Sequence, residues 1–242
     1  TVSISSFINL INNPYAVYAR EILKLRKIDP VFRPFDAKFK GTFFHELMRK
    51  FISDTLSKVK EEDLWLQHFL DLGLQDISKK IDNPRVSIRI KEELNNKAQD
   101  LVLNERKRRT SSIPVGLEVT GEKVFLLSSG YTIKLTAKAD RIDFLGSDET
   151  ILIDYKSSKP LRKEFESNLP QLDLEALLAS SGCFEGIKER DFISVAVIVM
   201  GAKADELRRE VGSDYLEKVQ KNFLSIMERA FSEEWGYGSK IS

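Results

Sequence analysis

The chain has 242 residues, of which 42% are hydrophobic and 31% are charged, which suits one large α/β domain with a sizeable core. No apolar run approaches the roughly 20 residues that cross a bilayer. The 38 Lys and Arg residues almost balance the 37 Asp and Glu residues, so the net charge of +1 argues neither for nor against a nucleic acid partner. The single cysteine, Cys183, excludes an intramolecular disulfide and a cysteine-ligated metal cluster. We therefore expect a cytoplasmic protein without a membrane partner.

The N-terminal part of the chain carries helix signals. Ser3 or Ser5 is a suitable N-cap for a short first helix, which should end at Asn12-Asn13 so that a second helix begins at Pro14. The segment 26–40 has two prolines and no clear period, which predicts a loop. Because the chain starts without Met and without a basic segment, we expect a domain of a longer protein rather than a signal peptide.

A long helix is predicted from about Gly41, with Thr42 or a neighbour as its N-cap. Its apolar side chains recur at helical spacing and should form the face that packs on the core: Phe44, Leu47, Met48, Phe51 and Ile52. Helical periodicity continues over about 60–110, with an interruption near 82–84, and we interpret this part as a helical insertion.

The period then changes from helix to strand. Three strand-like runs, separated by turn residues, predict a meander over about 115–127, 131–145 and 150–157. A helix should follow and stop at Gly182, then a buried strand over 191–200, and a closing helical region over 203–235. The predicted fold class is therefore α/β, with the core order helix, three strands, helix, strand and a mixed central sheet flanked by helices.

Two charged residues interrupt the apolar run of the third predicted strand. Asp154 and Lys156 point to the same face, because side chains alternate along a strand. A hairpin would bring Asp140 close to Asp154, and two half-buried carboxylates repel unless a cation lies between them. Mg²⁺ prefers such oxygen ligands, and a lysine beside it can stabilise a phosphate oxyanion or orient the attacking water. The alternative for Asp154 and Lys156 is an edge-strand ion pair that contributes less than about 1 kcal/mol.

These motifs resemble the PD-(D/E)xK nuclease signature, with Asp140 followed after thirteen residues by Asp154-x-Lys156. The stretches "ADRID", "LIDYKSS" and "PQLDLEALL" look like the RecB-type exonuclease branch, and "GTFFH" at 41–45 matches its Gly-x-x-x-His helix. The segment "NPYAVYAREILKLRKIDP" further resembles the C-terminal nuclease domain of AddB-type helicase–nuclease subunits. The resemblance implies a restriction-endonuclease-like core and one RecB-like nuclease domain over 1–242.

The resemblance also implies roles for individual residues. The metal ligands would be His45, Asp140, Asp154 and the backbone carbonyl of Tyr155, with Mg²⁺ as the ion and Mn²⁺ as a substitute. The catalytic set would be Asp140, Asp154, Lys156 and Gln171, where Gln171 helps to hold the lysine, the attacking water or the DNA backbone. Glu118, on the first strand, is a secondary candidate. The basic helix end is either a solvated surface or a phosphate contact, and it contains Arg106, Lys107, Arg108 and Arg109.

The chain departs from the resembled family at two places. Many AddB-type domains hold an iron–sulfur cluster with four cysteines, but Asn13 occupies one of those positions here and Cys183 alone cannot bind a cluster. We therefore expect no iron–sulfur cluster, and the missing cysteines also disfavour a free-standing nuclease of the Cas4 sort. Glu175 stands where the family often has Tyr, which indicates either an extra acidic group near the DNA path or a solvated helix position.

The leading hypothesis is a metal-dependent exonuclease that hydrolyses phosphodiester bonds of single-stranded DNA ends. A helicase motor would deliver these ends in double-strand break repair, together with an AddA-like partner subunit. The alternative hypothesis is a module of the same fold that no longer cuts, and instead binds DNA or acts as a scaffold for the helicase complex.

Overall fold

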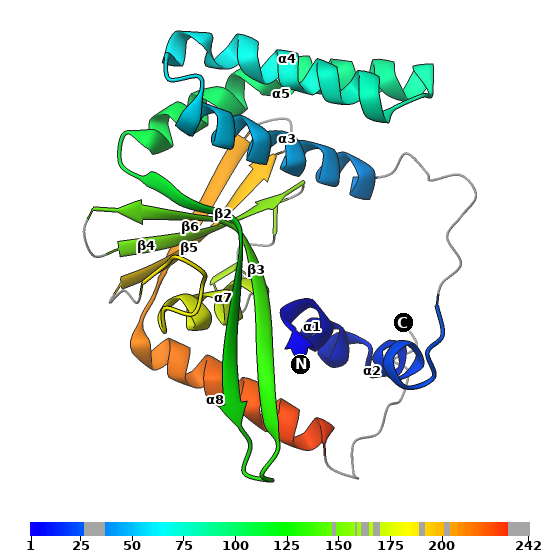
Figure 1. The fold of residues 1–242 in the computed structure, drawn as a ribbon, viewed down its shortest axis with the longest axis vertical. Coiled ribbons are helices and arrows are strands. Elements are labelled where there is room, and N and C mark those ends of the chain that lie inside the picture. Colours follow the sequence, from blue (N-terminus) through cyan, green and yellow to red (C-terminus); the bar gives the residue numbers. More distant parts are fainter. Residues whose placement is uncertain are drawn as a thin grey trace.

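The computed structural model of the chain describes residues 1–26, 37–146, 149–157, 159–160, 165–166, 170–188, 192–200 and 204–231. Within these residues, one mixed sheet has the strand order β1–β3–β4–β5–β6, and β2 pairs with β3 off this path (Figure 1). Most of the loop predicted for 26–40 lies outside the described residues. None of the helices in the described ranges has the length and apolar character needed to cross a bilayer.

The predicted meander is confirmed, and its strand ends lie within two residues of the prediction. β2–β3 and β3–β4 pair antiparallel, β4–β5 and β1–β3 pair parallel, and β5–β6 pairs antiparallel. The strands are β1 (Val2–Ser3), β2 (Ile113–Leu126), β3 (Thr132–Leu145), β4 (Glu149–Lys156), β5 (Phe192–Met200) and β6 (Ala204–Val211). The buried strand predicted over 191–200 corresponds to β5.

Helices cover both faces of the sheet (Figure 1). One face packs on α3 (Ala37–Ser57), α4 (Trp65–Lys80) and α5 (Pro84–Arg109), with the short 3₁₀ turn η2 (Glu62–Leu64) before α4. The other face packs on α1 (Ile4–Asn12), α7 (Pro170–Ala179) and α8 (Ser213–Ala230). The helix α2 (Pro14–Val17) and the π-helical turn η1 (Tyr18–Ile22) follow α1. The helices α4 and α5, in the segment predicted as a helical insertion, thus share one of the two layers with α3.

Side-chain caps fix the first helices as the sequence predicts. Of the two candidate N-caps, Ser3 caps α1, because its Oγ accepts from the Ser6 amide at 3.1 Å. Asn13 caps α2 in the same way, accepting from the Ala16 amide at 3.1 Å, and Pro14 is the first residue of that helix. The chain direction at the N-terminus is therefore set by local hydrogen bonds.

The start of α3 differs from the prediction. The helix begins at Ala37, so Gly41 and Thr42 lie inside it and Thr42 is not its N-cap. Phe39, one turn before Phe43, packs against the core, so the apolar face of the helix extends further toward the N-terminus than predicted. The predicted core face is confirmed, since all five of its side chains are buried: Phe44, Leu47, Met48, Phe51 and Ile52.

The prediction of a continuous helical region over 203–235 is wrong for its first part. Residues Ala204–Val211 form the strand β6, and α8 begins only at Ser213. The segment "ADELRREV" consists largely of good helix formers, but pairing with the apolar strand β5 overrides that propensity. Its charged side chains contact neighbouring carboxylates and cations, as in the ion pairs of Arg208 with Glu149 and of Arg209 with Asp173.

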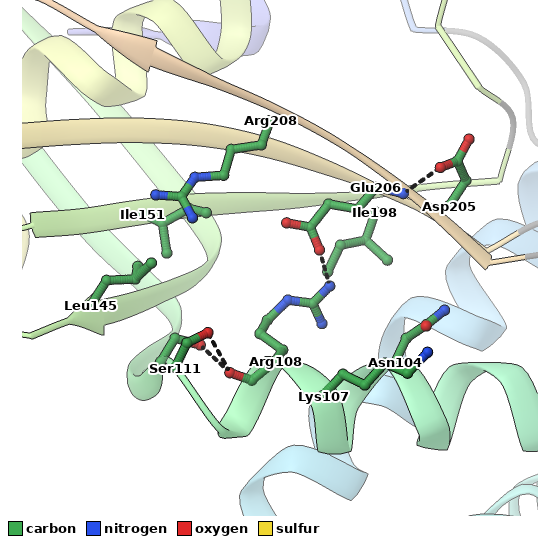
Figure 2. A pocket seen from close by; sticks show the side chains of 11 residues that line it. Asn104, Lys107, Arg108, Ser111, Leu145, Ile151, Ile198, Asp205, Glu206 and Arg208 are labelled. Carbon is green, nitrogen blue, oxygen red and sulfur yellow. Dashed lines mark hydrogen bonds and ion pairs between the residues drawn. The ribbon is translucent and has the colours of Figure 1, made fainter.

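The basic end of α5 faces a cavity of about 440 Å³ between α5, β4, β5 and β6 (Figure 2). Arg108 donates to Glu206 at 2.5 Å, Arg109 donates to Glu105 at 2.7 Å, and Arg106 donates to the carbonyl of Glu62. Protein groups therefore hold three of the four basic side chains, while Lys107 is exposed. A DNA contact by Arg106, Lys107, Arg108 or Arg109 stays a prediction.

A charged network lies inside the layer between α5 and the sheet. Arg141 is fully buried and donates to Asp143 at 2.5 and 2.7 Å, to Glu105 at 2.6 Å and to the hydroxyl of Tyr155 at 3.1 Å. Burial alone would raise the pKa of the Glu105 carboxyl, but the attraction of Arg141 and the hydrogen bond from it hold that pKa below its ordinary value. Ser112 donates to Asp143 at 2.8 Å and completes the network.

We predict that Glu105→Gln lowers the free energy of unfolding at neutral pH by roughly 3 kcal/mol, because it leaves buried cations short of a partner. Since folding lowers the pKa of Glu105, its stabilising effect is present above the ordinary value of 4.5 and is lost as the pH falls through the lower folded value. Denaturant unfolding of both proteins at several pH values measures this.

The matched control is Glu122→Gln, which removes an exposed pair with Lys134 and should change stability by less than about 1 kcal/mol. Equal stability of Glu105→Gln and the parent protein at neutral pH, or a gap between them that stays constant into acid, would contradict this account.

Candidate active site

The third strand of the meander presents its two charged side chains on one face, as predicted. The Lys156 Nζ lies 2.9 Å from Asp154 Oδ2, in an ion pair whose carboxylate is buried while the lysine side chain is 44% exposed. Both residues follow the parallel register of β4 with β5, so backbone pairing fixes their positions. The ammonium is thus held at one end by a buried carboxylate and remains accessible to a ligand from solvent.

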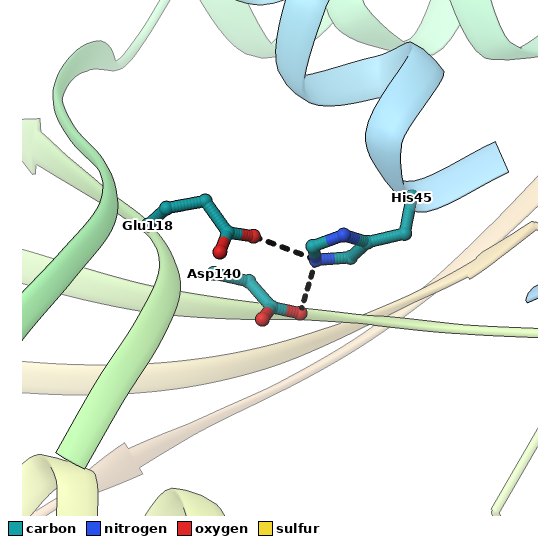
Figure 3. Close-up of side chains that lie close together, drawn as sticks. All are labelled: His45, Glu118 and Asp140. Carbon is teal, nitrogen blue, oxygen red and sulfur yellow. Dashed lines mark ion pairs between the residues drawn. The ribbon is translucent and has the colours of Figure 1, made fainter. Parts of the chain in front are cut away.

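Asp140 and His45 lie beside this pair. The Asp140 Oδ2 accepts from the Tyr155 backbone amide at 3.1 Å and lies 3.0 Å from the His45 Nε2 (Figure 3). The imidazole contacts the ring of Tyr155 edge-on, with centroids 5.9 Å apart. Gly41 lies one turn before His45, and a Cβ there would be 3.8 Å from Ser157, so α3 comes close to the end of β4. The position of α3 therefore places His45 next to the sheet.

Glu118 joins this group from β2. Its Oε1 lies 3.3 Å from the His45 Nε2 (Figure 3). Its carboxylate also pairs with Lys138. The pairs that flank it, Leu117 with Arg141 and Val119 with Ala139, place Glu118 opposite Asp140. Its φ of 55° is left-handed, which is strained for a residue with a Cβ and is tolerated only where the surroundings impose it. The backbone thus bends at the point where the two carboxylates meet.

The helix α7 supplies the remaining side chains of the site. The Gln171 Oε1 accepts from Lys156 at 3.3 Å, and its Nε2 donates to Asp154 at 3.4 Å and to Glu175 at 3.2 Å. Glu175 is only 3% exposed, so its interpretation as a solvated helix position is wrong. The packing of α7 against the sheet turns this residue inward, although the sequence alone favoured neither face of the helix.

The charged groups of the site shift the pKa values of their neighbours. Burial raises the pKa of Asp154 to about 6, Lys156 acts against this and the charge of Asp140 adds to it. The hydrogen bond with Asp140 raises the pKa of His45, burial opposes this, and the charges of Asp140, Glu118 and Asp154 raise it further. Negative charge therefore accumulates here beyond what the nearby cations balance, as expected where a metal ion binds.

The donor set fits a divalent metal ion. One ligand atom from each of His45, Glu118 and Asp140 lies within 4.8 Å of the others, which one ion can bridge with small side-chain adjustments. Carboxylate oxygens suit Mg²⁺ and Mn²⁺, and an added imidazole favours the latter. The structure thus brings together the predicted ligands His45 and Asp140 and adds Glu118 to them, while Asp154 is held by Lys156 and Gln171 at the edge of the group. Ligation through the carbonyl of Tyr155 stays a prediction.

Comparison with known families shows which family the chain belongs to. A family model described as the PD-(D/E)XK nuclease superfamily matches residues 1–237. The chain belongs to this superfamily. Its mixed sheet flanked by helices is consistent with the restriction-endonuclease-like fold that the sequence predicted for a PD-(D/E)XK protein. An AddB-type origin within the superfamily stays a prediction.

Individual relatives of this PD-(D/E)XK chain come from Rickettsia. Uncharacterized proteins of Rickettsia bellii and Rickettsia felis are 29% identical over 182 residues and 28% identical over 219 residues. These alignments cover 73% and 84% of the chain but only 21% and 24% of the relatives. The chain therefore spans about a fifth to a quarter of the length of these curated relatives.

The chain also resembles solved structures. A protein from Eubacterium rectale described as an exonuclease aligns over 94% of this chain and 79% of its own, with 12% identity and a TM-score of 0.45. The structure of LHK-Exo in complex with dAMP aligns over 77% of this chain and 90% of its own, with 11% identity and a TM-score of 0.30.

We predict that the chain binds Mn²⁺ and that Asp140→Asn weakens this binding at least about tenfold, a change of about 1.4 kcal/mol, because a charged donor is lost. Calorimetric titration with Mn²⁺ measures the affinity of both proteins and does not depend on nuclease activity.

The structure offers a matched control at His68, whose Nε2 lies 3.1 Å from Asp54 in an equivalent pair outside the site. Asp54→Asn should leave Mn²⁺ affinity unchanged. If both substitutions had the same effect, or neither had any, the ion would not bind at Asp140.

Proposed function

We propose that this chain is the metal-dependent deoxyribonuclease module of a larger protein and hydrolyses phosphodiester bonds of single-stranded DNA ends. The observation that carries the proposal is the Asp154–Lys156 pair on β4, with Asp140 and His45 beside it in one site. An edge-strand ion pair would need none of these neighbours. Membership of a nuclease superfamily supplies the reaction class.

Each side chain of the site has its own role in the proposed reaction. Asp140, Asp154, His45 and Glu118 would hold Mg²⁺ or Mn²⁺. A bound ion of this kind neutralises charge on the phosphate and makes an attacking water more acidic. The Lys156 ammonium, exposed on one side and anchored by Asp154 on the other, can contact a phosphoryl oxygen or orient the water. Gln171 keeps that ammonium in place.

The wider role rests on the resemblance to AddB-type nuclease domains. We extend the proposal to a module that receives single strands from a helicase motor in double-strand break repair, next to an AddA-like partner subunit. The matched segment makes up 21–24% of each Rickettsia relative, so most of such a protein is available for other domains.

We predict that Lys156→Met and Asp154→Asn each slow cleavage of end-labelled single-stranded DNA at least about a hundredfold, because each removes a charge that acts on the transition state. The assay contains Mg²⁺ or Mn²⁺, and circular dichroism verifies that both variants remain folded. Lys134→Met, at an exposed ion pair on the β2–β3 hairpin, is the control and should cut like the parent protein.

A circular single strand of the same length tests whether cleavage needs an end, and it should resist digestion. Normal cleavage by either active-site variant would refute the site assignment. A parent protein that binds DNA but does not cut it under these conditions would favour the scaffold hypothesis.

A further inference from the structure

We propose that Glu175 is a positioning residue of this site, which orients the Gln171 amide so that its carbonyl faces Lys156 and its amino group faces Asp154. This inference rests on the proposed nuclease function and names a residue that the PD-(D/E)xK motif does not include. Among the described hydrogen bonds, Glu175 is linked to the site through Gln171 and not directly through Asp154 or Lys156.

The helix α7 places the two side chains on one face. Gln171 and Glu175 are four residues apart, so they lie one above the other along the helix. The Gln171 Nε2 donates to the Glu175 Oε1 at 3.2 Å. Glu175 is 3% exposed, so bulk water has little access to this contact. An acidic side chain buried this deeply normally has a specific partner, and here the described partner belongs to the active site.

The three contacts of the amide define its orientation. A side-chain amide has two donor hydrogens and one acceptor oxygen. In the structure both donors face carboxyl oxygens, of Glu175 and Asp154, and the oxygen faces the Lys156 ammonium at 3.3 Å. The flipped amide would set its NH₂ group against the ammonium and its oxygen against two carboxyl groups. Glu175 therefore adds a second reason for the orientation that lets Gln171 hold the lysine.

The shifted pKa of Glu175 is compatible with this role. Burial raises its pKa well above the ordinary value, the charge of Asp154 adds to this, and the hydrogen bond from Gln171 acts in the opposite direction. A neutral carboxyl group can still accept from Gln171, and it does not repel the carboxylates of Asp154 and Asp140. The hydrogen bond from Gln171 needs only a carboxyl oxygen as acceptor, which both protonation states of Glu175 provide.

The surroundings of Glu175 allow its acceptor to be removed without large repacking. Gln171 and Glu175 border a cavity of about 310 Å³, which also touches Thr120, Thr136 and Lys138. Glu175→Met keeps the unbranched shape of the side chain and loses the acceptor, and the cavity gives the bulkier thioether space. Glu175→Gln keeps an oxygen acceptor at the same reach and serves as the conservative variant.

The kinetic test compares kcat and KM of these variants on single-stranded DNA. Glu175→Met should lower kcat by about ten- to a hundredfold, the usual range for residues that support a ligand from behind, with KM little changed. Glu175→Gln should recover most of that loss. In a Gln171→Met background, adding Glu175→Met should cause no further loss, because the amide through which Glu175 acts is gone.

A second readout is independent of cleavage. The side-chain amide protons of Gln171, followed by NMR, should exchange slowly in the parent protein and in Glu175→Gln and rapidly in Glu175→Met. If the parent protein did not cut DNA, the proposed function would fail, and this measurement would still decide whether Glu175 fixes the amide.

The matched control is Asp173→Asn, at another buried acid of α7 whose partners include Arg209 and Tyr215. It should reduce stability while leaving kcat and the Gln171 amide signals unchanged. Equal kinetic losses in Glu175→Gln and Glu175→Met would overturn the proposal, as would additive losses with Gln171→Met or unaltered amide exchange in Glu175→Met.

Discussion

Arg141 lies fully buried between the sheet and α5, and its guanidinium contacts two carboxylates and one phenol. A buried cation of this kind is stable only while its partners stay in place, so it fixes the distance between β3, β4 and the helical layer. The phenol belongs to Tyr155, whose backbone amide donates to Asp140 at 3.1 Å. The buried network and the candidate active site therefore share one residue of β4.

This arrangement separates the rigid and the reactive parts of the protein. Behind β4, every described charge of the network has an opposite charge close by, and the side chains are fully buried. At the active site the carboxylates outnumber the nearby cations, and burial raises the pKa of Asp154 to about 6. The left-handed Glu118 is further strain that the paired strands impose. The charge-balanced network behind β4 thus supports a group of carboxylates with excess negative charge at the candidate active site.

Local sequence signals were sufficient for the meander, the core face of α3 and the common face of Asp154 and Lys156, because each depends on a period of a few residues. These local signals failed where contacts between segments distant in sequence determine the secondary structure or the burial of a residue. The charged strand β6 forms only because β5 lies beside it, and Glu175 is buried only because α7 packs on the sheet. The meeting of Glu118 with His45 depends on a backbone bend between two paired strands, for which the sequence has no local sign.

The most direct test of the central claim is a crystal structure of the chain grown with Mn²⁺, measured with anomalous scattering. We expect one or two anomalous peaks within ligand distance of the site carboxylates and imidazole, with the Lys156 ammonium beside them and the buried Arg141 contacts intact; the expected ligands are His45, Glu118, Asp140 and Asp154. The absence of a peak at this place, together with side chains that point away from one another, would contradict the claim.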